Sequence, residues 1–200
     1  FAFEIDIINK MYSLITTAPP VPETTKEPFT DEEIKKVYEN KNDEWIETLI
    51  LYLFTGFRLN ELLSMELTQI NLETGFFNGG SKKKTGEKRI VPIHSYIQYI
   101  VKKRIKSNKK YLIEWDGKKL SKSQYYIFWN EMMEKLQMNH TPHECRHTFR
   151  SKLDSAKANK KCIDLMMGHK SKDVGERIYT HKTFEELKEA IELIKFDFWV

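Results

Sequence analysis

Hydrophobic and polar residues alternate in two different ways along the 200-residue chain. Apolar residues recur every three or four positions over most of its length, which predicts amphipathic helices. Between Ile70 and Ile93 the pattern changes to short β-like pieces (QINLE, GFFNGG and KRIVPI) separated by glycines. We therefore expect a mainly α fold with a small antiparallel β-sheet (α+β). The expected helices begin at Thr30 and then cover residues 45–54, 59–67, 94–106, 121–137, 142–156, 160–167, 171–179 and 184–195.

The start of the main domain is visible in local signals. A Pro- and Thr-rich stretch (TTAPPVPETTKEP) cannot stay helical and is typical of a linker. Directly after it, Thr30 and Glu33 have the spacing of a helix capping box, and Phe29 can form a hydrophobic staple with Ile34. The expected division is residues 1–15, the end of a truncated N-terminal domain; 16–28, an interdomain linker; 29–195, the main domain; and 196–200, an apolar C-terminal tail.

Composition excludes several classes of protein. No apolar run approaches the roughly 20 residues that span a bilayer, and two cysteines, Cys145 and Cys162, provide no disulfide framework. We expect a cytoplasmic protein without membrane contact. Because four large apolar residues of the tail should not remain in water, we hypothesise that the tail docks on a neighbouring subunit; the alternative is that it packs on its own domain.

Charge is unevenly distributed along the chain. The formal net charge is +4, but fourteen Lys or Arg stand against three acids between Lys82 and Lys122, a local balance of +11. Such a block is a solvated face unless nearby chemistry needs cations, in which case it forms a phosphate-binding surface.

The segment Thr141 to His147 (TPHECRH) has the most readable local chemistry. Thr141 and Glu144 form a second capping box, with proline at the first helical position. His143 and Arg146 then lie on one face near a helix start, where an anion is favoured. The same residues spell H-E-x-x-H, the spacing of a zinc protease built on His143, Glu144 and His147.

Three other segments place charged or nucleophilic side chains beside predicted turns. Arg58 follows a glycine break, with Glu61 three residues on to orient its guanidinium. An apolar helix ends at Gly168, a helix C-cap, and His169 follows directly; Tyr179 comes ten residues later. A predicted hairpin tip holds the basic residues Lys82, Lys83, Lys84, Lys88 and Arg89.

In chain order these motifs resemble those of the tyrosine recombinases, specifically the integrases of phages and conjugative transposons. The motifs are T-G-x-R-x-x-E-L around Arg58, K-T-G at Lys84, H-x-x-R-H-T-F from His143, L-M-x-G-H ending at His169, and Y-x-H at Tyr179. Five motifs in the same order and spacing are specific, whereas the zinc interpretation explains only one. The resemblance covers residues 29–195 and implies the catalytic-domain fold of that family, preceded by a core-binding domain.

The resemblance implies an enzyme that cuts and rejoins DNA through a covalent 3′-phosphotyrosine bond, integrating or excising a mobile element without metal, cofactor or ATP. Forked donors suit the phosphate oxygens in the transition state, and a lysine can protonate the leaving 5′ oxygen. The implied roles are Tyr179 as nucleophile; Arg58, Arg146 and His169 as phosphate ligands; His143 as base; Lys84 as general acid; Glu61 as the orienting residue; and Lys82, Lys83, Lys88 and Arg89 as DNA-backbone contacts.

The implied partners are double-stranded DNA and three further copies of the chain, as a tetramer on paired DNA sites, with accessory DNA-bending or excision proteins as further candidates. The expected location is the cytoplasm of a bacterial cell carrying a phage or transposon. Three alternatives stay open: a topoisomerase with the same chemistry, the zinc metalloprotease, and a non-catalytic DNA-binding module.

Overall fold

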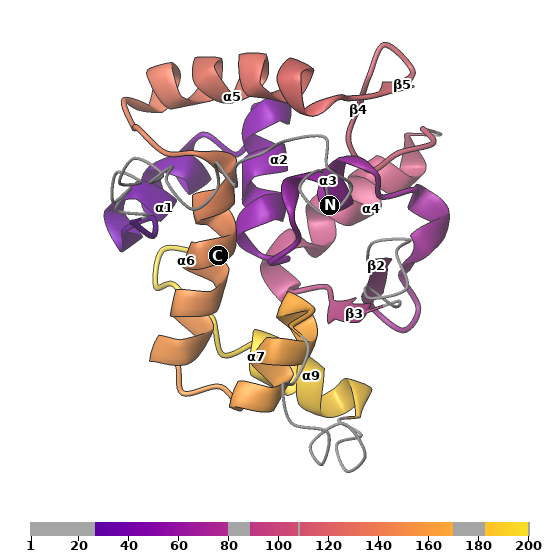
Figure 1. Ribbon diagram of the computed structural model, residues 1–200, viewed down its shortest axis with the longest axis vertical. Coiled ribbons are helices and arrows are strands. Elements are labelled where there is room, and N and C mark those ends of the chain that lie inside the picture. Colours follow the sequence, from indigo (N-terminus) through magenta and orange to yellow (C-terminus); the bar gives the residue numbers. More distant parts are fainter. Residues whose placement is uncertain (1–26, 80–88, 108, 170–182, 200) are drawn as a thin grey trace, which may run out of the picture.

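The strongly apolar segment that follows Asp43 forms the central helix, α2 (Glu44–Leu53). The computed structural model describes residues 27–79, 89–107, 109–169 and 183–199, and within it every residue of α2 from Ile46 to Leu53 is buried. Helix α2 is buried because α1 (Asp31–Glu39), α5 (Lys122–Leu136) and α6 (Pro142–Ser155) contact it. Figure 1 shows α5 across one end of the domain, with α7 (Lys160–Met167) and α9 (Phe184–Ile191) at the opposite end.

Except for one short hairpin, the described elements follow the predicted order. The helices are α1 (Asp31–Glu39), α2, α3 (Leu59–Leu63), α4 (Gln98–Lys106), α5 (Lys122–Leu136), α6 (Pro142–Ser155), α7 (Lys160–Met167) and α9 (Phe184–Ile191), with 3-10 turns at Leu67–Gln69 and Ser95–Ile97. The strands are β1 (Ile70–Asn71), β2 (Phe76–Gly79), β3 (Arg89–Pro92), β4 (Glu114–Trp115) and β5 (Lys118–Lys119).

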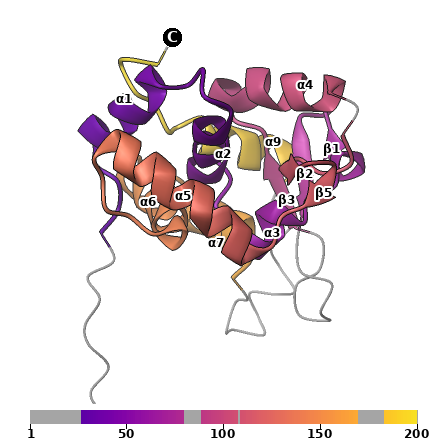
Figure 2. The ribbon, with the colours of Figure 1, turned by 90° about the horizontal axis from the view of Figure 1, so that it is seen from above.

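The first three strands form the small antiparallel sheet that the sequence predicts. Their order is β1-β2-β3, and Phe77 on β2 lies opposite Val91 on β3. Both of these side chains are fully buried, because β3 is covered by α7 and α9. Figure 2 shows the sheet at one side of the helical body. The mainly α fold with a small antiparallel sheet is therefore confirmed.

Local capping signals locate the helix starts correctly. Thr30 caps α1, and its backbone NH donates to Glu33 Oε2 at 2.8 Å, as the predicted capping box requires. Two predicted helices end earlier in the structure, α3 at Leu63 and α9 at Ile191. The predicted helix 171–179, residues 1–15 and most of the predicted linker lie outside the described residues.

The hairpin β4–β5 was not predicted, since we expected only helices after His94. Its strands pair Glu114 with Lys119 and Trp115 with Lys118. Asp116 and Gly117 form the turn with φ values of 51° and 68°, the left-handed conformation that Asp-Gly favours in two-residue hairpin loops. The turn signal was present, but two-residue strands are too short for a β pattern to be recognised.

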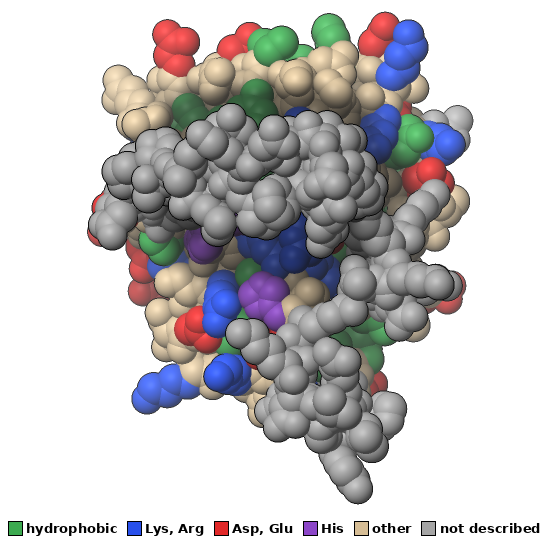
Figure 3. Space-filling view, in the orientation of Figure 1, with side chains coloured by type: hydrophobic (Ala, Val, Ile, Leu, Met, Phe, Trp, Pro, Cys, Tyr) green, Lys and Arg blue, Asp and Glu red, His purple; other side chains and the backbone are tan. Residues whose placement is uncertain are grey.

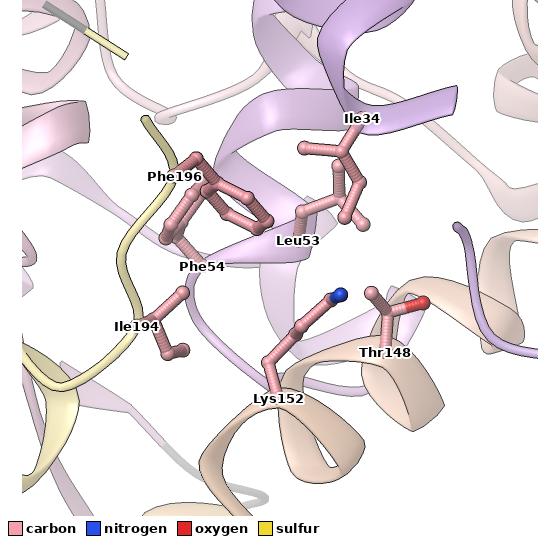
Figure 4. A pocket seen from close by; sticks show the side chains of 7 residues that line it. All are labelled: Ile34, Leu53, Phe54, Thr148, Lys152, Ile194 and Phe196. Carbon is pink, nitrogen blue, oxygen red and sulfur yellow. The ribbon is translucent and has the colours of Figure 1, made fainter. Parts of the chain in front are cut away.

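Residues 196–199 of the apolar tail lie on their own domain. Phe196 and Trp199 are 8% and 7% exposed, and the Trp199 ring stacks on Tyr96 with a centroid separation of 5.1 Å. Figure 4 shows Phe196 and Ile194 facing α1, α2 and α6 around a small pocket. These contacts favour the alternative that the tail packs on its own domain, because that domain already covers these side chains.

A buried histidine anchors this tail. His94 is 1% exposed, and its Nε2 lies 2.9 Å from the Ile194 carbonyl. Its Nδ1 accepts from the Tyr96 backbone NH at 3.0 Å, which leaves Nε2 to donate in the neutral ring. Burial lowers the pKa of His94, although the nearby Glu192 carboxylate opposes the shift. The neutral ring thus joins the segment before α4 to the segment after α9.

Among the described residues, no helix has both the length and the apolar composition needed to cross a membrane.

Candidate active site

Arg58 stands at the turn between two apolar helices. Gly56 in this turn has a φ of +60°, and a Cβ placed there would lie 2.4 Å from the Phe149 ring, so only glycine fits. Arg58 is the N-cap residue of α3, and its backbone NH donates to Glu61 Oε2 at 2.8 Å. Its guanidinium, with a side chain 53% exposed, donates to Glu61 Oε1 at 3.2 Å. Glu61 therefore binds both the backbone NH and the guanidinium of Arg58.

Arg146 lies beneath this turn. It is 4% exposed, and its guanidinium donates to the backbone carbonyls of Gly56 and Met167. Burial, followed by the charges of Arg89 and Arg58, lowers its pKa to about 10. Arg146 therefore stays protonated at neutral pH, and two carbonyls fix its direction.

His169 reaches Arg146 from the end of α7. Gly168 ends that helix in the left-handed conformation, with φ +65°, and thereby turns His169 back towards α6. Its Nε2 lies 3.2 Å from Arg146 Nη2, and its Nδ1 lies 3.5 Å from Asp164 Oδ1. Because the guanidinium can only donate, Nε2 accepts. Partial burial, followed by the charge of Arg146, lowers the pKa of His169.

His143 is exposed in the first turn of α6, one turn before Arg146. Its ring lies edge-to-face with that of His147, with centroids 4.8 Å apart. The predicted capping box is present, with the Thr141 backbone NH donating to Glu144 Oε2 at 2.9 Å. The structure thus places His143 at a helix start and His169 beside Arg146. Arg58 is close enough for its charge to lower the pKa of Arg146.

Arg89 corrects one prediction. It was expected among the exposed DNA-backbone contacts, but its side chain is 7% exposed and donates to Glu61 Oε2 at 2.8 Å. The reason is strand alternation: Arg89 faces the interior with Val91, whereas Ile90 between them is 39% exposed. This period of two in KRIVPI was the signal that could have identified Arg89 as an interior residue.

Five predicted residues lie outside the described part of the chain: Lys82, Lys83, Lys84, Lys88 and Tyr179. Their roles stay predictions. Figure 3 shows Lys or Arg side chains gathered beside a histidine at the centre of the face that it presents. This is the arrangement of fixed cations that suits a phosphate group.

The structure gives Glu144 a different task from that of a protease base. Its Oε2 caps α6 and also lies 2.8 Å from His140 Nδ1. Within the described ranges, no group of three or more His, Cys, Asp or Glu side chains could hold a metal ion. The zinc-protease alternative therefore lacks both a third ligand among these residues and an available carboxylate.

Comparisons with known proteins point the same way. The model of the phage integrase family matches residues 28–186. Tyrosine recombinase XerA of Pyrococcus furiosus is 30% identical over 187 residues, which cover 87% of this chain and 64% of that protein. Tyrosine recombinase XerA of Pyrococcus horikoshii is 28% identical over 189 residues, covering 88% and 64%. The chain thus spans less than two thirds of the length of these relatives.

Solved structures share the fold. The integrase of mycobacterium phage Brujita superposes with a TM-score of 0.73 at 16% identity, covering 97% of this chain and 67% of that one. The Tn1549 transposon integrase, solved in complex with circular intermediate DNA, superposes with a TM-score of 0.66 at 20% identity, covering 96% and 73%. The fold is therefore that of the integrase catalytic domain. With the family match over residues 28–186, this shows that the chain belongs to the phage integrase family.

Proposed function

We propose that this chain cleaves and rejoins DNA strands at specific sites through a transient covalent bond between Tyr179 and a 3′ phosphate. The observation that carries the proposal is that Arg146 Nη2 lies 3.2 Å from His169 Nε2 and that the charge of Arg58 acts on the same Arg146. The Arg146 guanidinium is held by two backbone carbonyls, so it is oriented before any anion arrives. Preorganised donors of this kind stabilise the charge that develops on a phosphate during displacement.

The proposed reaction is a balanced exchange of phosphodiester bonds. The Tyr179 oxygen attacks phosphorus, the bond to the 5′ oxygen breaks, and Lys84 gives that oxygen a proton. His143 takes the proton of the tyrosine hydroxyl. Attack by a 5′ hydroxyl of the same or another duplex reverses these steps, so the free energy of the broken bond is conserved.

Arg58 and Arg146 have different tasks in this scheme. Arg146 is buried and held by two carbonyls, so it forms the rigid floor of the site. Arg58 is half-exposed and can turn towards a phosphate while Glu61 holds its backbone. To donate to the same phosphate, His169 has to carry a proton on Nε2, the nitrogen that accepts from Arg146 in this structure. Lysine at either position could not supply the same forked geometry.

The test is a trapping experiment that requires no knowledge of the target sequence. The chain is incubated in EDTA with nicked suicide duplexes whose sequence is randomised around the nick, and protein–DNA adducts that survive SDS are collected. We expect an adduct for the wild type and for the matched variant Tyr126→Phe, whose tyrosine is 40% exposed. We expect none for Tyr179→Phe. An adduct that persists in Tyr179→Phe, or its absence from the wild type, contradicts the proposal.

The role of Lys84 has a separate test. A duplex with sulfur in place of the leaving 5′ oxygen does not need a general acid, because a thiolate leaves without protonation. Lys84→Ala is expected to cleave this duplex at nearly the wild-type rate and to cleave the normal duplex on the order of 100-fold more slowly. Equal losses on both duplexes would assign Lys84 another role, and the same pair of duplexes can be applied to Lys82 and Lys83.

We also propose that the working unit is a tetramer on paired DNA sites and that these sites belong to a mobile element. The support is that the Tn1549 transposon integrase, which shares the fold, was solved with circular intermediate DNA. Recombination differs from topoisomerase activity in joining two duplexes. Mixing two labelled duplexes that carry the selected site should give exchanged products and a complex with the mass of four chains. Relaxation of supercoiled DNA without exchange would favour the topoisomerase instead.

A further inference from the structure

Arg89 is a buried cation that the proposed chemistry does not use. It begins β3, its side chain is 7% exposed, and its guanidinium carbon lies 4.6 Å from the centre of the Phe57 ring. Glycine at position 168 leaves room for this guanidinium, because a Cβ there would lie only 2.6 Å from Arg89 Nη1. Burying an unpaired guanidinium is costly, so the groups that bind Arg89 indicate its role.

The two ends of the Arg89 fork hold two different parts of the site. Nη2 donates to Glu61 Oε2 at 2.8 Å, on α3. Nη1 donates to the Met167 carbonyl at 2.7 Å, at the end of α7. One planar group thus fixes the separation of two segments that are more than 100 residues apart in the sequence.

Both of these acceptors also hold phosphate ligands of the proposed reaction. Glu61 accepts from the backbone and the guanidinium of Arg58. The Met167 carbonyl accepts from Arg146 Nη2 at 2.6 Å, and the same Nη2 lies 3.2 Å from His169. Arg89 therefore shares one acceptor, Glu61, with Arg58 and another, the Met167 carbonyl, with Arg146.

We propose that Arg89 is a positioning residue that sets the distance between Arg58 and the Arg146–His169 pair. Its buried guanidinium reaches these residues through Glu61 and the Met167 carbonyl and contacts neither DNA nor the reacting atoms. This inference rests on the proposed function, because it assigns Arg89 a task in that reaction. A merely structural role predicts a loss of stability alone, whereas a positioning role predicts a loss of cleavage rate in protein that is folded and bound to DNA.

The test compares Arg89→Lys with a matched control elsewhere in the fold. Arg104 is also buried, at 5% exposed, and its guanidinium also joins a carboxylate, Glu47 at 3.3 Å, to backbone carbonyls, including that of Leu112 at 3.1 Å. An ammonium cannot span two acceptors as the guanidinium fork does. Both Arg→Lys variants should therefore lower the melting temperature.

Only Arg89→Lys should slow the chemistry. With a selected suicide duplex at saturating concentration, and well below the melting temperatures, its single-turnover rate of adduct formation should fall on the order of 10- to 100-fold. Its dissociation constant for DNA should not change, and Arg104→Lys should cleave at the wild-type rate. Arg89→Gln, which buries no charge, serves as a second variant and should show the same loss of rate.

The outcomes separate the two proposals. A wild-type cleavage rate in Arg89→Lys or in Arg89→Gln, or an equal loss of rate in Arg104→Lys, overturns the positioning role. Those results leave the proposed function intact, because the wild-type protein still forms its adduct. Absence of the wild-type adduct contradicts the proposed function itself.

Discussion

Replacing Glu61 by glutamine tests whether the arginine network is formed in solution. The change keeps the size of the side chain and removes its charge. The Glu61 side chain is 8% exposed and accepts from Arg89 at 2.8 Å and from Arg58 at 3.2 Å. Glu61→Gln therefore leaves three neighbouring guanidinium groups, those of Arg58, Arg89 and Arg146, without this carboxylate.

The size of the effect follows from the burial of each contact. The amide oxygen of the glutamine still accepts from the charged Arg89, so the buried contact loses its ion-pair attraction and keeps a hydrogen bond. Breaking a buried ion pair costs about 3–5 kcal/mol and the retained bond to a charged group contributes about 1.5–3 kcal/mol, which leaves a loss of about 1.5–2 kcal/mol. The single amide oxygen cannot accept from both Arg58 and Arg89, so the hydrogen bond of one of them is weakened, which costs about 1 kcal/mol more. Solvent screens the half-exposed Arg58 contact, which adds little. The expected loss is about 2–3 kcal/mol in the free energy of unfolding.

Urea unfolding followed by tryptophan fluorescence measures this loss, since the chain has four tryptophans. The matched control is Glu66→Gln, which makes the same change at an exposed ion pair with Lys110, 3.8 Å apart and with side chains 41% and 65% exposed. The control should cost less than about 0.5 kcal/mol. If Glu61→Gln is as stable as this control, the buried network does not hold the site in solution and the reasoning fails.

Three further changes test the fold around the site. Gly56→Ala should destabilise the chain by about 2–4 kcal/mol, from backbone strain and from overlap with Phe149. The control Gly75→Ala, at a glycine with φ +75° and open space around it, should cost only the backbone strain of about 1 kcal/mol. Equal melting temperatures of the two variants would contradict the close contact between Gly56 and Phe149. Because the pKa of His94 is lowered, the unfolded chain takes up this proton at a higher pH than the folded chain, and the stability present above about pH 6.5 declines as the pH falls below it. His94→Gln should therefore cost less stability at pH 5 than at pH 7.5 in urea titrations, and a cost independent of pH would refute the neutral buried ring. Trp199→Ala should destabilise the isolated chain by about 3 kcal/mol if the tail packs on its own domain. Unchanged thermal stability would favour docking of the tail on a neighbouring subunit instead.

Local chemistry explains which parts of the site can be predicted from the sequence. Thr30 with Glu33, Thr141 with Glu144, and Gly168 all act within one turn of helix, so their spacing alone places them. These signals are sufficient to put His143, Arg146 and His169 at helix ends. The convergence of Arg146 with His169 across two helices follows from the family resemblance and not from periodicity.

The positions of Arg89 and of the tail depend on contacts between distant segments, unlike the local hairpin β4–β5, which was also missed. Arg89 was assigned to the exposed lysine hairpin by its neighbours in the sequence, but it bonds to Met167, 78 positions away. The tail was assigned to a partner because four apolar residues needed cover, and Tyr96 with Phe54 supplies it within the same chain. Neither partner can be identified from spacing, because both depend on how the sheet packs against the helices.

The most direct test of the central claim is to identify the residue that carries the DNA. The trapped adduct is digested with protease and nuclease, and tandem mass spectrometry locates the remaining nucleotide on the peptide. We predict a 3′-linked nucleotide on Tyr179 in the wild type, and its loss with DNA binding retained in Arg146→Lys. A nucleotide on any other side chain, or wild-type yield of adduct in Arg146→Lys, would contradict the assignment of this site.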